Sequence, residues 1–301
     1  MPDLSIQELL SPELLLKISD YSLLSRLAVK GFLSGIHPST CHGSGNEFVQ
    51  YRNYTPGDDL KLLDWKLLAR RNKLCTKIFA EETNMRCAIV LDASASMAYK
   101  GKNAIGTKFH YASAVAACLA SLCHQQTDQA GLFIYADKIL SATPPGHNVG
   151  NISHILATLQ NVSPSNKANH LLALQKIGEY LKKRSLVVLL TDGYFQEKTL
   201  PYFLKQLKFS GHDCIVCQIL DPDELHFPFQ NTMQFIDSET SESRTATASL
   251  TRDEYLKKMN AFLEKTRQIC LNYQADYLQI NTSQSIAPVL TSYLNMRGGK
   301  H

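Results

Sequence analysis

The chain has 301 residues, 44% of them hydrophobic and 19% charged, which is typical of a soluble globular protein with a sizeable core. Its formal net charge of +4 is small and basic residues do not cluster with aromatic ones, so we expect no nucleic-acid partner. The longest apolar runs have only the length of a strand and the N-terminus is acidic, which argues against a membrane span and a secretion signal. We therefore expect a cytoplasmic protein.

Two segments precede the regular part of the chain. Between Pro12 and Leu33, apolar residues recur at helical spacing, which predicts an N-terminal helical segment over 1–34. The next segment, 35–86, is rich in glycine, serine, histidine, proline and threonine at its start and contains two short strand-like runs. We expect loops, turns and a β-hairpin there, and interpret this segment as an extension packed on the main domain.

Charged residues are dense in this extension. Asp58, Asp59 and Asp64 lie close in sequence to several basic residues, among them Arg52. One interpretation is a charged surface that binds a partner through Arg52, Asp58 and Asp59. The other is an internal network of salt bridges that fixes the extension. Trp65, the single tryptophan, is expected to be a packing anchor.

From residue 87 to residue 297, short apolar runs alternate with segments of helical spacing. Strands separated by helices indicate a mostly parallel sheet covered on both faces, so we expect one three-layer α/β/α domain over 87–297. Ligand sites in open sheets of this kind lie at the carboxyl ends of the strands. Strands are predicted at 87–92, 130–136, 185–191, 213–219, 232–237 and 276–280, and helices at 107–124, 150–160, 169–183, 198–208, 252–273 and 285–294.

The eight cysteines are scattered, and many of them lie inside apolar segments, which indicates reduced core residues. Cys214 and Cys217 form a CxxC motif, but it lies within a strand-like apolar run. Residues three apart on a strand point to opposite faces, so we expect neither metal binding nor redox chemistry from this pair.

The strand predicted at 87–92 ends in polar side chains. Asp92, Ser94 and Ser96 follow its apolar residues at alternating positions. Because the chain turns beyond a strand end, their oxygens can converge on one point. Carboxylate and hydroxyl oxygens suit Mg²⁺ or Mn²⁺, which are held by few protein groups and several waters. The structural alternative is a serine-rich turn that caps the next helix.

A second predicted strand, 185–191, ends in Asp192 and Gly193. If the two strands are parallel, Asp92 and Asp192 emerge at the same edge of the sheet. Two carboxylates in an apolar setting repel each other, and a cation between them relieves that cost. Gly193 allows a sharp turn or the close approach of a ligand. The structural alternative is that Asp192 caps the following helix.

These two strand ends resemble the metal-ion-dependent adhesion site of von Willebrand factor A-like domains. Further blocks, from about residue 34 to 297, resemble the domain of unknown function 58 family. The resemblance implies a von Willebrand factor A-like, Rossmann-like fold with the metal ligands Asp92, Ser94, Ser96 and Asp192. The blocks include Tyr51-Arg52-Asn53-Tyr54-Thr55-Pro56-Gly57-Asp58-Asp59, Asp64-Trp65-Lys66, Lys77-Ile78-Phe79-Ala80-Glu81-Glu82, Asp128-Gln129-Ala130-Gly131-Leu132 and Leu220-Asp221-Pro222-Asp223-Glu224-Leu225.

The resemblance also implies a role and a partner. Proteins of this family resemble bacterial or archaeal partners of MoxR-type AAA+ ATPases, acting in metal insertion, complex assembly or chaperoning. At the site it implies partner contacts by Met97, Asn169 and Gly193. One position departs from the pattern: where a full site takes a threonine, this chain has Ala168, which offers no side-chain oxygen. Ser163, Ser165, Asn166, Asn169 or a water could substitute, so we expect a degenerate site for Mg²⁺ or Mn²⁺.

The sequence offers little for catalysis. Ser94 and Ser96 stand in no motif of a Ser-His-Asp arrangement, a phosphate-binding loop is missing, and His170 is the one histidine in a loop expected at this edge. We therefore expect a non-enzymatic interaction module whose cation accepts a partner carboxylate. Two alternatives are a Mg²⁺- or Mn²⁺-dependent phosphoesterase and a metal-independent scaffold that binds through 47–82.

Overall fold

The computed structural model divides into two compact units, His37–Asn84 and Met1–Ile36 together with Met85–His301. Asp58, Asp59 and Ala168, which the sequence singles out, lie outside the residues that the structure describes, so their roles stay predictions. The described residues are 20–35, 48–55, 63–71, 73–79, 85–102, 104, 106–146, 150–164, 169–236 and 243–297.

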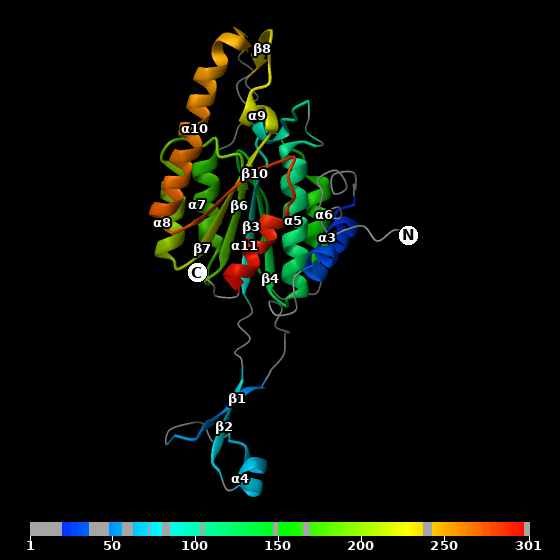
Figure 1. The fold of residues 1–301 in the computed structure, drawn as a ribbon, viewed down its shortest axis with the longest axis vertical. Coiled ribbons are helices and arrows are strands. Elements are labelled where there is room, and N and C mark those ends of the chain that lie inside the picture. The colour runs from blue at the N-terminus through cyan, green and yellow to red at the C-terminus, as the bar shows by residue number, and fades with distance from the viewer. Residues whose placement is uncertain are drawn as a thin grey trace. The chain divides into compact units, whose positions relative to one another are not determined.

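The smaller unit contains a two-stranded antiparallel sheet where a β-hairpin was predicted, because a long connection that includes a helix joins its strands (Figure 1). β1 (Phe48–Asn53) pairs antiparallel with β2 (Cys75–Phe79), and α4 (Trp65–Arg71) lies between them in sequence. Asp64 Oδ1 accepts two backbone N–H groups of the first turn of α4, at 2.9 and 3.0 Å, which is the geometry of a helix cap. Asp64 Oδ2 accepts the Tyr51 hydroxyl at 2.9 Å. Asp64 thus ties the two strands to the helix through hydrogen bonds, and the network of salt bridges expected for this segment stays a prediction.

Trp65 and Arg52 of this unit lie at the surface. Trp65 is 61% exposed and α4 buries none of its residues, so Trp65 does not anchor the packing within this unit. Arg52 is exposed on β1. Its role as a partner contact stays a prediction.

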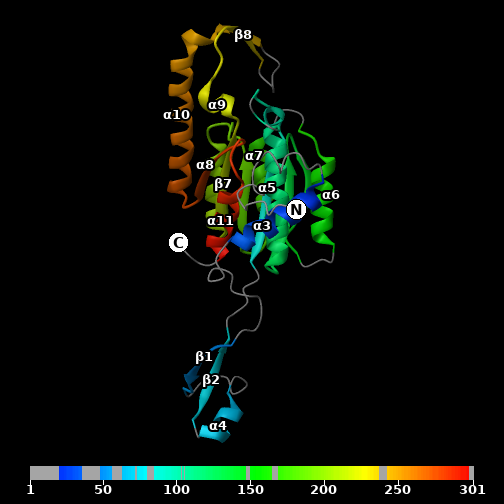
Figure 2. The same ribbon diagram turned by 45° about the vertical axis from the view of Figure 1, so that its right-hand side comes forward.

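The larger unit is built on a six-stranded sheet with the order β10-β7-β6-β3-β4-β5. Neighbouring strands are parallel except for the edge strand β5, which pairs antiparallel with β4. Helices cover both faces (Figures 1 and 2), so the three-layer α/β/α fold is confirmed. The strands are β3 (Arg86–Asp92), β4 (Gln129–Tyr135), β5 (Ile139–Thr143), β6 (Leu186–Thr191), β7 (Asp213–Leu220) and β10 (Asp276–Asn281).

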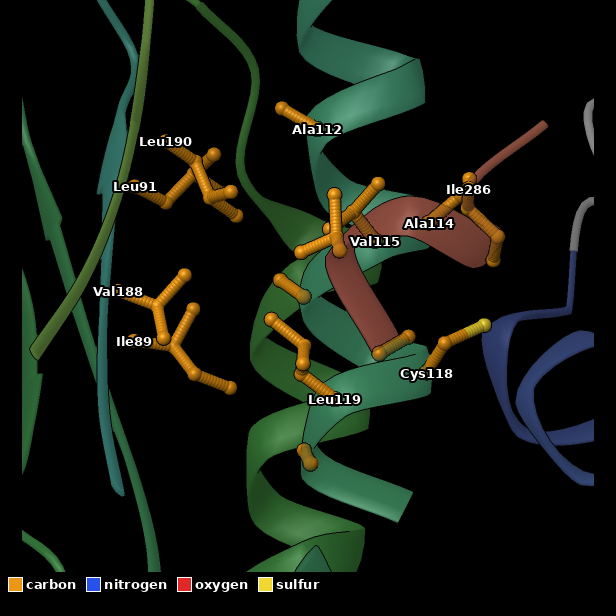
Figure 3. Packing of buried hydrophobic residues seen from close by; sticks show 14 of the residues in the cluster. Ile89, Leu91, Ala112, Ala114, Val115, Cys118, Leu119, Val188, Leu190 and Ile286 are labelled. Atoms are coloured by element: carbon orange, nitrogen blue, oxygen red, sulfur yellow. The ribbon is translucent and has the colours of Figure 1, made fainter. Parts of the chain in front are cut away.

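The two faces of the sheet have separate cores, because successive side chains of a strand point to opposite sides. Ile89 and Leu91 of β3 pack with α3, α5, α6 and α11 (Figure 3), whereas Ala88 and Val90 pack with α7, α8 and the end of α10. The helices are α3 (Tyr21–Gly35), α5 (Lys108–Gln125), α6 (Asn151–Asn161), α7 (His170–Tyr180), α8 (Thr199–Phe209), α10 (Ala248–Asn272) and α11 (Ala287–Arg297).

Helix α3 is part of the core of the larger unit. Leu24 and Ala28 are fully buried and belong to the cluster that contains α5. The Ser121 hydroxyl of α5 donates to the Ser25 hydroxyl of α3 at 2.8 Å. The N-terminal helix therefore completes one face of the three-layer fold.

Three described strands of the larger unit differ from the prediction. β8 (Thr232–Ile236) does not join the central sheet but pairs with β9 (Ser243–Thr247) in a separate antiparallel sheet. The side chains of β8 are mostly exposed, which a strand in the middle of a parallel sheet would not be. β5 and β9 are strands that the sequence did not indicate.

The CxxC cysteines lie on opposite faces of β7, as their spacing predicts. Cys214 belongs to the core with α8 and Cys217 to the core with α5. The cysteines of the described ranges are buried and unpaired. Within those ranges, no three side chains of histidine, cysteine, aspartate or glutamate converge as a metal-binding group. No described helix combines the length and the apolar character that crossing a bilayer demands.

Candidate functional site at the strand ends

β3 and β6 end side by side at one edge of the sheet. They are parallel neighbours with Leu91 opposite Leu190, so Asp92 and Thr191 follow at the same level. The Thr191 hydroxyl donates to Asp92 Oδ2 at 2.8 Å, and the Ser94 backbone N–H donates to Asp92 Oδ1 at 2.9 Å. All three residues are fully buried. The Asp92 carboxylate therefore links the two strand ends.

The two serines lie together at the start of η3 (Ala95–Ala98), a single turn of 3-10 helix. Their hydroxyl oxygens are 3.0 Å apart, and Ser96 is partly exposed whereas Ser94 is buried. Met97 is fully buried in the core beside α5. This corrects the expectation that Met97 contacts a partner, because its side chain does not reach the surface.

Asp192 follows β6 and is engaged by a lysine. Lys108 Nζ, from the first residue of α5, lies 3.0 Å from Asp192 Oδ2 and 2.8 Å from Glu224 Oε1 of α9 (Pro222–His226). Lys108 and Asp192 are almost completely buried. Burial opposes the charge on Lys108, but the two carboxylates outweigh it and hold the pKa of Lys108 above its usual value. Burial raises the pKa of Glu224, although Lys108 opposes that shift.

Gly193 makes the sharp turn after this aspartate. Its φ is 84°, and its N–H donates to the Thr191 hydroxyl at 3.1 Å. A side chain there would meet Gln218, whose amide donates to the Asp192 carbonyl at 3.0 Å. Gly193 is buried, so the structure gives it a conformational role rather than a surface for a partner.

Histidine and asparagine come from the start of α7. His170 Nδ1 lies 3.6 Å from Asp92 Oδ2 and 3.4 Å from the Tyr135 hydroxyl, in a buried setting. Burial raises the pKa of Asp92, and Asp192 adds to this shift while His170 opposes it. Asn169 caps α7, since its Oδ1 accepts the Leu172 N–H at 3.3 Å. Asn169 is exposed and stays available as a partner contact.

The fit of a divalent cation depends on which oxygens are free to coordinate it. Both oxygens of Asp92 accept hydrogen bonds, and Asp192 Oδ2 is bonded to Lys108. The two serine hydroxyls and Asp192 Oδ1, which accepts the Tyr194 N–H at 3.4 Å, are the least engaged of the predicted ligand atoms. A divalent cation held by Asp192 would lie close to the Lys108 ammonium, and like charges at short range repel. The described residues therefore do not fit a divalent cation unless Lys108 is displaced. Binding of Mg²⁺ or Mn²⁺ stays a prediction from the sequence.

Sequence reasoning missed Lys108 and Glu224. A lysine in the first turn of a helix is an unusual choice, because the positive end of the helix dipole disfavours a cation there. Asp221-Pro222-Asp223-Glu224 is a recognisable helix start, in which Asp221 and Glu224 form a capping box. The unusual lysine and the capping box each mark a position with a special role. Neither signal indicates that Lys108 and Glu224 contact each other.

The loop before α5 is held by the same helix start. The Gly101 N–H donates to Asp221 Oδ2 at 2.8 Å, and the Lys102 N–H donates to Asp223 Oδ2 at 3.1 Å. The Tyr99 hydroxyl lies 3.5 Å from Asp223 Oδ2. These contacts fix the loop that connects the serines to Lys108.

The three-layer fold and the Asp-x-Ser-x-Ser strand end together define a von Willebrand factor A-like domain. Residues 50–264 match the model of the family described as "Protein of unknown function DUF58". The chain belongs to this family, as the resemblance of its sequence blocks predicts.

Several known proteins are similar to the chain. It is 21% identical over 234 residues to the uncharacterized protein Mb1516 of Mycobacterium bovis, which covers 76% of this chain and 72% of that protein. The structure is similar to that of BatB from Bacteroides thetaiotaomicron, with a TM-score of 0.47, 13% identity and coverage of 71% and 98% of the two chains. For the SpRpn10 VWA domain the TM-score is 0.40 at 14% identity, with coverage of 69% and 93%.

Proposed function

We propose that this protein is a non-catalytic interaction module that presents its strand-end site to a protein partner. The observation that carries the proposal is a pair of exposed tyrosines beside the buried ion pair. Tyr99 is 38% exposed and Tyr194 is 40% exposed, and Lys108 Nζ lies 6.0 and 5.4 Å from their ring centres. Tyrosines around a desolvated polar centre are typical anchors of protein interfaces.

The polar groups of the site support binding rather than catalysis. Ser94 and Ser96 contact each other, while His170 faces Asp92 and Tyr135. Neither serine hydroxyl therefore lies against a base, as hydrolysis by a serine would need. The hydroxyls that do contact a base, Thr191 on Asp92 and Tyr135 on His170, are fully buried. The alternative of a metal-dependent phosphoesterase would show as turnover of a phosphoester with added Mg²⁺ or Mn²⁺ that Asp192→Ala abolishes.

For the partner, we propose a MoxR-type AAA+ ATPase, as the family resemblance implies, with a role in complex assembly, metal insertion or chaperoning. Such an ATPase works where ATP is plentiful, so the proposal includes a cytoplasmic location. The contact takes one of two forms, a metal bridge to a partner carboxylate or a metal-independent contact. The ion pair of Lys108 with Asp192 favours the second form.

The test is the affinity of the purified chain for the MoxR-type ATPase of the same genome, measured by biolayer interferometry. We expect Tyr194→Ala to weaken binding by about thirtyfold, because hot-spot aromatic residues contribute about 2 kcal/mol or more. Phe209→Ala is the matched control, since this aromatic residue is 94% exposed at the far end of α8. Its affinity should equal that of the wild type.

Each assay is run with EDTA and with Mg²⁺. Loss of binding in EDTA would support the metal bridge, and binding that chelation leaves unchanged would support the metal-independent contact. The proposal is wrong if folded Tyr194→Ala and Tyr99→Ala proteins bind the ATPase as tightly as the wild type does. Circular dichroism of each variant confirms that it is folded.

A further inference from the structure

Lys108 is buried at a position where a lysine is costly. It begins α5, where the helix dipole opposes a positive charge, and it is 1% exposed. Lysines are almost never fully buried without a charged partner. The cap of α5 is made by the preceding Thr107, whose hydroxyl accepts the His110 N–H at 3.0 Å. Helix capping therefore does not explain a lysine at this position. The cost of burying its charge must be offset by contacts with other parts of the fold.

Two carboxylates and two aromatic rings surround the ammonium. The bonds to Asp192 and Glu224 reach residues 84 and 116 positions along the chain. Glu224 is itself held, because its Oε2 accepts the Asp221 N–H at 2.8 Å and its Oε1 lies 3.3 Å from the Tyr194 hydroxyl. Lys108 thus joins α5, the end of β6 and α9 at the strand ends. This is the place where the sequence predicts a divalent cation.

We propose that the Lys108 ammonium is the resident cation of this site and neutralises Asp192 in place of a divalent metal. An ammonium offers one positive charge and three donors, and here two carboxylates accept from it. A divalent ion bound at Asp192 would have to displace Lys108 or stand beside it, and like charges at short range repel. The inference concerns the ion content of the site and does not depend on the identity of the partner.

The test compares the full-length wild type with Lys108→Met by isothermal titration with Mn²⁺ and by thermal unfolding in EDTA and in Mn²⁺. For the wild type we expect no titration heat and a change in Tm below about 1 °C. Lys108→Met removes the charge and leaves Asp192 and Glu224 facing each other. It should have a lower Tm in EDTA, gain Mn²⁺ binding, and recover about 5–10 °C at roughly a hundredfold excess over the Kd.

Two control variants sharpen the comparison. Lys108→Met combined with Asp192→Asn lacks the carboxylate that would hold the ion, so it should show no response to Mn²⁺. Lys205→Met removes an exposed lysine of α8 and should behave as the wild type.

The proposal is overturned if the wild type binds Mn²⁺ with a rise in Tm that Ser96→Ala or Asp192→Asn removes. It is also overturned if Lys108→Met folds but gains no Mn²⁺ response. Should Lys108→Met fail to fold, Mn²⁺ titrations of the wild type and of Ser96→Ala decide the question. If neither protein binds Mn²⁺, the result supports Lys108 as the cation of the site. If the wild type binds Mn²⁺ and Ser96→Ala does not, the proposal is overturned.

Discussion

Replacing Asp128 with alanine should lower the free energy of unfolding by about 3–5 kcal/mol, the usual cost of removing one partner from a buried ion pair. Asp128 Oδ2 accepts the Tyr293 hydroxyl at 2.6 Å and Arg297 Nε at 2.7 Å. Its Oδ1 accepts the Met85 N–H at 2.9 Å. The carboxylate therefore fastens the last helix, α11, to the start of β3, and without it a buried hydroxyl and a guanidinium lose their acceptor.

Urea unfolding followed by circular dichroism measures this loss. Asp253→Ala is the control, because Asp253 is an exposed aspartate of α10, and its free energy of unfolding should stay within about 0.5 kcal/mol of the wild type. A loss below about 1 kcal/mol for Asp128→Ala would contradict the prediction. Such a small loss would mean that apolar contacts, such as those of Leu290, are enough to hold α11 in place without the carboxylate.

Replacing Gly101 with alanine should cost about 3 kcal/mol of stability, at the upper end of what overpacking a filled interior causes. A methyl group there would overlap Asp221 Oδ1 and Asp223 Oδ2. Both carboxylates are buried and bonded to backbone N–H groups, so neither can swing aside without breaking those bonds. The loop that carries Tyr99 would have to shift instead, and partner binding should weaken together with stability.

Thermal unfolding and the ATPase affinity are measured on the same Gly101→Ala protein. Gly146→Ala is the matched control, since the nearest atom to its new methyl group would be Pro144 O at 3.8 Å. Gly146→Ala should unfold within about 0.5 kcal/mol of the wild type. If Gly101→Ala and Gly146→Ala were equally stable, the start of α9 would not restrict the position of the loop that carries Tyr99 and Gly101.

The central strands were predictable from sequence because strands buried on both faces form unbroken apolar runs. β6 is such a run, and all of its residues are buried. β5 was not predicted because its five residues are alternately half-buried and exposed, and an alternation of that length is a weak indication of a strand. β8 was assigned to the wrong sheet because strand character in a sequence does not say which strand it pairs with.

The candidate site was predictable only in part. Asp92 and Asp192 could be brought together because parallel neighbouring strands end at one edge. The side chains that contact these aspartates could not be predicted. Lysine side chains are mostly exposed to solvent, and only the folded chain shows that Lys108 is buried between Asp192 and Glu224. Met97 was misplaced for a related reason, since adjacency to a motif in sequence says nothing about burial.

Helix α3 precedes the smaller unit in the chain, yet α5, against which it packs, follows that unit. Translation runs from the N-terminus, so the ribosome releases α3 well before α5 exists. During that interval the apolar side of α3, with Leu24 and Ala28, has no native neighbour to cover it. The larger unit can close only after all of His37–Asn84 has been translated, which makes the order of synthesis and the order of assembly differ in this protein.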